Sequence, residues 1–149
     1  MTTRILFVCL GNICRSPTAE AVVRAHAQGL NVLLDSAGTG GWHVGDAPYG
    51  PMQDAARARG IDMSDLRARQ VFAQDFSAFD LIVVMDAQNA RDVEFLRPRG
   101  NETPVRLMTD YAPGLGETAV PDPYYTRDFD GALDLIDAAA QGLVRSLKG

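Results

Sequence analysis

The sequence predicts a single α/β domain over residues 1–149, built as three layers in which a four-stranded parallel sheet is flanked by helices in a doubly wound arrangement. Three observations support this fold class. Strand-like and helix-like segments alternate along the chain, the strand-like runs are apolar on both faces, and the connections are short. The chain has 149 residues, of which 46% are hydrophobic, so it can bury one sizeable core.

The first predicted strand is Ile5–Val8, where β-branched and aromatic residues suit a strand buried on both faces. After a short loop, Ser16 is a predicted N-cap and Pro17 the first helical residue, and Gly29 supplies a C-cap for the helix. Val32–Leu34 is the second predicted strand. Together these segments predict a strand, loop, helix and strand in succession.

The rest of the chain repeats this alternation. We expect a helix over residues 51–59, a strand over residues 81–85, a helix over residues 87–97, a strand over residues 105–108 and a helix over residues 128–148. The last helix has an apolar stripe with helical spacing, formed by Leu133, Ile136, Ala140, Leu143 and Leu147. This stripe predicts that one face of the helix packs against the core.

Residues 8–17 read Val-Cys-Leu-Gly-Asn-Ile-Cys-Arg-Ser-Pro and follow the first strand, at the edge of the sheet where doubly wound folds bind ligands. Gly11 allows the backbone to turn, and Asn12 tolerates a left-handed conformation. Successive amides can then point inward beside a helix N-terminus, which makes a site for a dianion such as phosphate. The planar fork of Arg15 can bind two of its oxygens.

Cys9 lies where the first strand ends and the loop begins, so its sulfur faces the same amides. Helix N-termini and nearby cations stabilise thiolates, which makes Cys9 a candidate nucleophile toward phosphorus. Ser16 can donate its hydroxyl hydrogen to this sulfur. The alternative is a buried structural Cys9 beside a surface Arg15.

The Walker pattern of nucleotide-triphosphate sites is absent from the sequence, so the loop gives no support for nucleotide-triphosphate binding.

Charge and composition argue against several other classes of protein. With 14 Lys and Arg against 19 Asp and Glu, the net charge is −5, which disfavours nucleic acids and anionic membranes as partners. The N-terminal segment lacks an export-signal pattern and two cysteines suit a reducing compartment, so we expect a cytoplasmic protein. His26 and His43 lie without further ligands at metal-binding spacing, so no metal site is expected.

Several motifs together resemble the low-molecular-weight protein tyrosine phosphatases, and the likeness covers nearly the whole chain. The matching segments are residues 9–16, Asp35-Ser36-Ala37-Gly38-Thr39, Ala68-Arg69-Gln70, Met85-Asp86 with Asn89, and Asp122-Pro123-Tyr124-Tyr125. The resemblance implies a flavodoxin-like sheet of four parallel strands. It also implies hydrolysis of phosphotyrosine, and of small aryl phosphates, without a metal or other cofactor.

The resemblance further implies the roles of individual residues. Cys9 attacks phosphorus and carries a cysteinyl-phosphate intermediate, while Arg15 and the loop amides hold the equatorial oxygens. Asp122 protonates the leaving phenolate oxygen and later helps to activate water. The expected phosphate-binding residues are Leu10, Gly11, Asn12, Ile13, Cys14, Arg15 and Ser16.

Supporting roles are implied in the same way. Asn12, Ser16, Ser36 and Asp86 are expected to hold the loop in its shape. Many members have a histidine before Ala-Arg-Gln that braces the loop asparagine, and Leu66 stands at that position here.

Cys14 has two interpretations. It is either a small residue packed under the loop or, as the family uses the matching cysteine, a partner that traps oxidised Cys9 in a reversible disulfide. Trp42, Tyr124 and Tyr125 are candidates for the wall of a cleft around an aryl ring, and ordinary partial burial is their alternative role.

Other functions remain open on the same loop. An arsenate reductase relays electrons through further cysteines, and the sequence has none after Cys14. By resemblance, a protein-arginine phosphatase has a small polar residue where this chain has Ile13. A phosphate-binding module or phosphocysteine carrier has no need of Asp122. For the phosphatase, the expected partners are a tyrosine-phosphorylated protein as substrate and inorganic phosphate as product, on a monomer or weak dimer.

Overall fold

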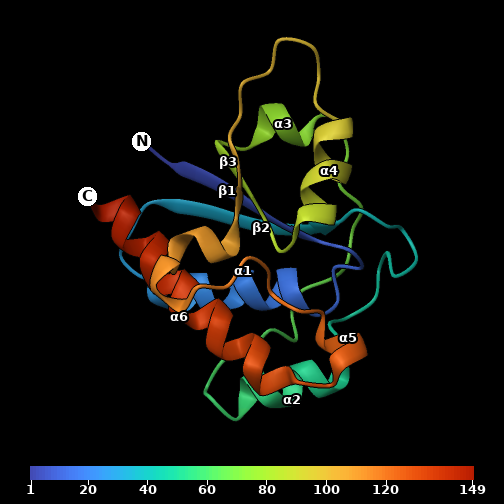
Figure 1. Ribbon diagram of the computed structural model, residues 1–149, viewed down its shortest axis with the longest axis vertical. Helices are drawn as coiled ribbons and strands as arrows, with labels where there is room; N and C mark the ends of the chain where they lie inside the picture. Colours follow the sequence, from blue (N-terminus) through green and yellow to red (C-terminus); the bar gives the residue numbers. More distant parts are fainter.

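A four-stranded parallel sheet forms the middle layer of the structure, a computed structural model that describes residues 1–149. The strands are β1 (Thr3–Cys9), β2 (Val32–Gly38), β3 (Leu81–Val84) and β4 (Val105–Leu107), and their order is β2-β1-β3-β4. All neighbouring strands pair in parallel. The predicted α/β class with a four-stranded parallel sheet is therefore confirmed (Figure 1).

Helices cover both faces of the sheet (Figure 1). One face packs against α1 (Arg15–His26), α2 (Gly50–Arg57) and α6 (Phe129–Lys148), and the other against α3 (Asp75–Ala78) and α4 (Ala87–Phe95). The remaining elements are the short helix α5 (Pro123–Thr126) and two 3-10 turns, η1 (Met108–Tyr111) and η2 (Pro113–Leu115). No helix combines the length and the apolar character needed to cross a membrane.

The pleat of β1 divides its side chains between two cores. Ile5, Phe7 and Cys9 belong to the core shared with α1 and α6, whereas Leu6 and Val8 belong to the core on the side of α3 and α4. All five residues are buried. By the same alternation, the side chain of Cys9 lies on the face shared with Ile5 and Phe7, against which α1 packs. Cys9 is also the last residue of β1.

Strand β2 is longer than the sequence pattern predicts. The apolar run ends at Leu34, but the strand continues to Gly38 because residues 35–38 pair in register with residues 6–9 of β1. Polar residues are tolerated here because β2 is an edge strand and their side chains find partners. Asp35 Oδ2 accepts a hydrogen bond from the side chain of Arg69, and Ser36 is bonded beneath the loop that follows β1.

The predicted cap of α1 is wrong. The helix begins at Arg15 with Cys14 at the N-cap position, and no side chain caps it. The Ser16 hydroxyl contacts Cys9 and Asn12 instead, so the first N–H groups of the helix stay unpaired. Proline is still tolerated in the first turn, because an N–H there has no intrahelical acceptor.

The remaining ends of the four predicted helices lie within two residues of the prediction. Helices α1, α2 and α4 end two residues earlier than predicted, at His26, Arg57 and Phe95. Glycines in the left-handed region follow α1 and α2, namely Gly29 with a φ of +87° and Gly60 with a φ of +80°. Helix α6 follows Asp128, whose carboxylate caps it by accepting from Gly131 N, and the predicted stripe is buried except for Leu147, which is partly buried.

Gly38 marks the point where β2 passes the loop that follows β1. A Cβ atom here would stand 2.8 Å from the Leu10 carbonyl oxygen and 3.1 Å from the Gly11 carbonyl carbon. We predict that Gly38→Ala displaces this loop and lowers the free energy of unfolding by about 1–3 kcal/mol. Urea-induced unfolding measures the change. Gly50→Ala is the control, because a Cβ there meets no atom within 4 Å, and equal stability of the two variants would contradict this account.

Candidate active site

Most N–H groups in the loop from Cys9 to Ser16, here called the anion loop, have no partner. The backbone N–H groups that donate no hydrogen bond within the protein are those of Leu10, Gly11, Ile13, Cys14, Arg15 and Ser16. The turn depends on Asn12, whose φ of 58° lies in the left-handed region. Unpaired N–H groups in a mostly buried loop are costly unless a ligand accepts from them, so the anion loop is suited to an oxyanion.

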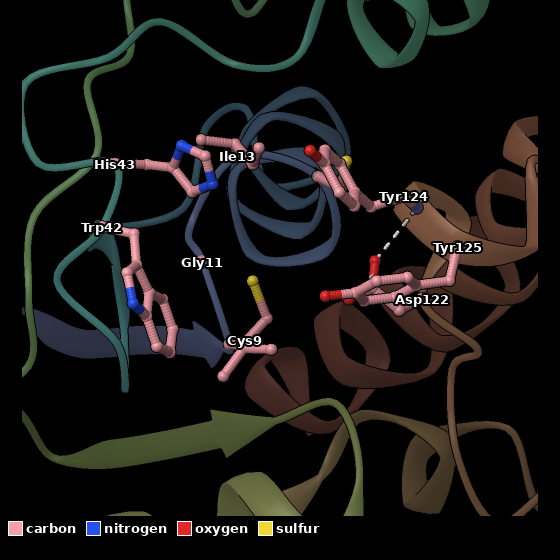
Figure 2. Close-up of a pocket in the computed structure, with 10 residues that line it drawn as sticks. Cys9, Gly11, Ile13, Trp42, His43, Asp122, Tyr124 and Tyr125 are labelled. Atoms are coloured by element: carbon pink, nitrogen blue, oxygen red, sulfur yellow. Dashed lines mark hydrogen bonds between the residues drawn. The ribbon is translucent and has the colours of Figure 1, made fainter.

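The Cys9 sulfur lies inside the anion loop and points into the neighbouring pocket (Figure 2). Asn12 N donates to Cys9 Sγ at 3.3 Å, and Ser16 Oγ lies 3.1 Å from the same sulfur. Because Asn12 Nδ2 donates to Ser16 Oγ at 2.7 Å, the Ser16 hydroxyl can direct its own hydrogen to the sulfur. Two donors are thus in place for a negative charge on Cys9.

Arg15 is buried, with an exposed fraction of 3%. Its Nη1 donates to Asp86 Oδ2 at 2.7 Å and to the Val120 carbonyl at 3.0 Å, and its Nη2 lies 3.4 Å from Asp122 Oδ2. Its Nε is buried without a partner. Burial opposes the charge, but Cys9, Asp122 and Asp86 together raise the pKa of Arg15. Nη1 therefore fixes the guanidinium, and Nε and Nη2 form the edge available to an anion.

Asp86 connects Arg15 to the segment between β3 and α4. It stands between β3 and α4, and its Oδ1 accepts from Asn89 N at 2.7 Å to cap α4. Asn89 Oδ1 in turn accepts from Met85 N at 3.2 Å. The residue predicted to support the loop thus contacts Arg15 directly.

A buried network of hydrogen bonds lies beneath the anion loop. Asn12 Nδ2 donates to Ser16 Oγ and, at 3.0 Å, to Ser36 Oγ, while Asn12 Oδ1 accepts from Arg69 N at 3.0 Å. Ser36 Oγ then donates to Glu20 Oε1 at 2.7 Å. Glu20 and Arg69 are not among the supporting residues predicted from the sequence. The one sequence signal for Glu20 is its position four residues after Ser16, on the same face of α1.

Leu66 packs against the core at the position where the resemblance places a bracing histidine. Its side chain has no hydrogen-bonding group, so it cannot bond to Asn12. The backbone N–H of Arg69 donates to Asn12 Oδ1 at 3.0 Å. A main-chain donor thus braces the loop without the histidine.

Glu20 is an ionisable group held in this network, with an exposed fraction of 7%. Burial is the main effect that raises the pKa of Glu20 to about 7. The hydrogen bond from Ser36 and the charge of Arg24 lower the pKa, while the charges of Asp35 and Asp65 raise it. The carboxyl group of Glu20 therefore changes its charge near neutral pH.

A pocket of about 240 Å³ opens above the anion loop. Trp42 and His43 lie on one side of it, and Asp122, Tyr124 and Tyr125 lie on the other (Figure 2). Trp42 and Tyr125 are 73% and 71% exposed and form the rim, whereas Tyr124 is 39% exposed. The complete lining is Cys9, Leu10, Gly11, Ile13, Cys14, Trp42, His43, Asp122, Tyr124 and Tyr125. His43 is the lining residue whose place here the sequence did not predict.

Asp122 stands at the N-cap of α5. Its Oδ1 accepts from Tyr124 N at 3.1 Å, the dashed line in Figure 2, and its Oδ2 faces Arg15 Nη2. Pro121 and Pro123 flank it and limit the freedom of its backbone. The carboxylate therefore borders the same pocket as the Cys9 sulfur.

Cys14 also borders the pocket, and both cysteines are free. Burial, together with the charges on Asp122 and Cys9, raises the pKa of Cys14 to about 12. Cys14 is therefore a neutral thiol at physiological pH. No group of three or more His, Cys, Asp and Glu side chains is placed to hold a metal ion.

A parallel α/β sheet whose first loop holds a thiol among unpaired N–H groups, beside a buried arginine, has the arrangement expected of an oxyanion-binding site. Comparison with known proteins gives the family. The model of the family described as low molecular weight phosphotyrosine protein phosphatase matches residues 4–149. The chain belongs to this family and is a protein tyrosine phosphatase, a phosphoric monoester hydrolase that acts on phosphotyrosine.

Individual relatives agree over almost the full length. The chain is 41% identical over 148 residues to the low molecular weight protein-tyrosine-phosphatase YfkJ of Bacillus subtilis, which covers 97% of this chain and 95% of YfkJ. The crystal structure of YfkJ matches with a TM-score of 0.94 at 40% identity, covering 99% of this chain and 96% of that one. The crystal structure of a Drosophila arginine phosphatase matches with a TM-score of 0.91 at 29% identity, covering 97% and 98%.

We predict that Glu20 makes the stability of the protein fall as the pH rises from about 4.5 to about 7. The pKa of Glu20 is about 7 in the folded protein, against 4.5 for an ordinary glutamate. In this interval the folded protein binds more protons than the unfolded chain, so folding weakens as the pH rises. Above about pH 7, Glu20 is charged in the folded protein, and burial of this charge lowers the free energy of unfolding by its full amount. Glu20→Gln removes this loss, and its amide oxygen still accepts from Ser36.

Urea-induced unfolding at about pH 5 and about pH 8 measures this effect. Relative to the wild type, Glu20→Gln is expected to gain on the order of 2 kcal/mol in the free energy of unfolding between these two conditions. Glu102→Gln, at an exposed position, is the matched control and keeps the wild-type pH dependence. A Glu20→Gln variant that also keeps it would show that Glu20 is not the titrating group.

Proposed function

We propose that phosphotyrosine hydrolysis runs through a covalent intermediate on Cys9. The thiolate attacks phosphorus, so that an S–P bond forms while the P–O bond to the tyrosyl oxygen breaks and Asp122 gives a proton to that oxygen. A water molecule then attacks the cysteinyl phosphate and passes a proton to Asp122. The S–P bond breaks, inorganic phosphate leaves and the thiolate is restored.

The observation that carries this proposal is the set of unpartnered donors around the Cys9 sulfur. The unpaired N–H groups of the anion loop and Arg15 Nε are held in place by the fold before any substrate arrives. They suit the equatorial oxygens of a phosphoryl group, where negative charge is spread in the transition state. Donors fixed in advance need no reorganisation during the reaction, which is why they lower its barrier.

Ser16 is proposed to stabilise the sulfur as nucleophile and as leaving group. Its hydroxyl lies 3.1 Å from Cys9 Sγ and is oriented by the donation from Asn12 Nδ2. Asn12 and Ser36 then serve to keep the anion loop in the shape that leaves its N–H groups free. Asp86 holds Arg15 through Nη1, at 2.7 Å.

The pocket supports an aryl phosphate on a protein as the substrate. Trp42 and Tyr124 offer apolar surfaces on opposite sides of the Cys9 sulfur (Figure 2). Ile13 adds a further apolar wall, which offers no hydrogen bond to the N–H groups of a phosphoarginine. We therefore propose that this chain selects phosphotyrosine, although its fold is shared with an arginine phosphatase.

Other expectations from the sequence stay predictions. The pairing of Cys14 with oxidised Cys9 is proposed as a protection against irreversible oxidation. The cytoplasmic location and the state of a monomer or weak dimer are proposed on the sequence alone.

Phosphate release from a phosphotyrosine peptide, in the presence of a chelator, tests the proposed nucleophile. The wild type is expected to release phosphate, and Cys9→Ser is expected to abolish release because serine is a much weaker nucleophile at this site. Cys14→Ser is the matched control and is expected to retain activity in reducing buffer. Release that persists in Cys9→Ser would exclude the covalent route.

Asp122→Ala separates a phosphatase from a phosphate-binding module or phosphocysteine carrier. The change is expected to lower turnover of phenyl phosphate about 10²- to 10⁴-fold, because the poor leaving group loses its proton donor. Binding of inorganic phosphate, measured by calorimetry, is expected to persist. Unchanged turnover of phenyl phosphate would show that Asp122 is not the general acid.

A further inference from the structure

Residues 121–128 carry both Asp122 and Tyr124, and few of their hydrogen bonds reach distant parts of the chain. Most of the hydrogen bonds made by residues 121–128 join these residues to one another or to the first turn of α6, up to residue 132. The other two reach distant parts of the chain. One joins Asp122 Oδ2 to Arg15 Nη2, and the other runs from Arg127 Nη1 to Tyr49 Oη at 3.0 Å. A phosphate on Arg15 competes for the first bond. The second is then the remaining hydrogen bond from this segment to a distant part of the chain.

Arg127 is held by more than this hydrogen bond. Its guanidinium carbon lies 5.3 Å from the ring centroid of Tyr49 and 5.1 Å from that of Phe129, which are cation–π distances. Its Nη1 also reaches the Tyr124 carbonyl at 3.4 Å. Its φ of 63° is left-handed and ends α5, a conformation that favours glycine. The Arg127 side chain makes contacts here that a glycine would lack.

Tyr49 is itself attached to the anion loop. Its backbone N donates to the Ile13 carbonyl at 2.8 Å, and it stands immediately before α2. Its ring lies 5.1 Å from the ring of Tyr124, and Figure 1 shows α5 beside α2. The contacts therefore run from Arg127 through Tyr49 to Ile13, which connects the segment bearing Asp122 with the loop that bears Cys9.

We propose that Arg127 is a positioning residue for the general acid, because it ties the Asp122 segment to Tyr49 and so to the anion loop. This proposal rests on the proposed role of Asp122. Arg127 acts on Asp122 through the backbone of α5, and it makes no contact with the reacting atoms. Its contribution is therefore greatest for esters whose leaving group needs a proton.

The test compares kcat/KM for phenyl phosphate, which has a poor leaving group, with that for dinitrophenyl phosphate, which has a good one. Arg127→Gly removes the side chain and suits the left-handed backbone. It is expected to lower kcat/KM for phenyl phosphate about 10-fold, and for dinitrophenyl phosphate less than about 2-fold. The affinity for inorganic phosphate is expected to stay at the wild-type value, since Arg15 and the anion loop are unchanged.

Further variants make the test specific. Tyr49→Phe keeps the ring but removes the acceptor, so it is expected to shift the same ratio in the same direction, and it serves if Arg127→Gly fails to fold. Arg145→Ala, a surface change on α6 outside this set of contacts, is the control and keeps the wild-type ratio. In an Asp122→Ala background, Arg127→Gly is expected to add nothing, because the group that it positions is gone.

Each contrary result has a distinct meaning. An equal loss of kcat/KM for both esters would show a merely structural role for Arg127, and no loss would show no role; both overturn the proposal. A further loss in the Asp122→Ala background would overturn it too. If Asp122→Ala lowered kcat/KM equally for both esters, Asp122 would not be the general acid, and this result would hold independently of Arg127.

Discussion

The anion loop can bind phosphate only while its N–H groups are kept from pairing with the protein, and much of the structure serves this constraint. Asn12 takes a left-handed conformation and is bonded on three sides, to Ser16, Ser36 and Arg69. Strand β2 supplies Ser36 and ends at Gly38, which lets the loop backbone pass closely. The shape of the loop therefore depends on hydrogen bonds among its own residues and on residues outside it, such as Ser36 and Arg69.

Electrostatics at the site are local. The chain has a net charge of −5, yet the buried Arg15 places a cation beside the unpaired N–H groups of the anion loop. Asp86 fixes one end of its guanidinium and Asp122 faces the other, so the arginine keeps its charge in a buried place. At such short range, and in a buried place, a few donors outweigh the field of distant acidic side chains, which salt and water screen.

The fold class and the Cys9 to Ser16 loop can be predicted from local sequence. The residues that hold this loop in place from other segments cannot. The apolar run of β1 and the Cys9 to Ser16 loop are contiguous, so their pattern is visible in one segment. The sequence does not predict that β2 continues past Leu34, because Asp35 and Ser36 have low strand propensity. Pairing with β1 outweighs that propensity in the structure. Ser16 resembles a cap but bonds to Cys9. Glu20 and Arg127 act across contacts between distant segments, which no local pattern records.

The central claim is that the unpaired donors of the anion loop hold a phosphoryl group on the Cys9 sulfur during turnover. Mass spectrometry of rapidly quenched and digested enzyme, after mixing with a phosphotyrosine peptide, tests it most directly. The account predicts one added phosphoryl group on the peptide that contains Cys9, appearing before phosphate release and decaying with turnover. A phosphoryl group on another residue, or turnover with none on the enzyme at any time, would contradict it.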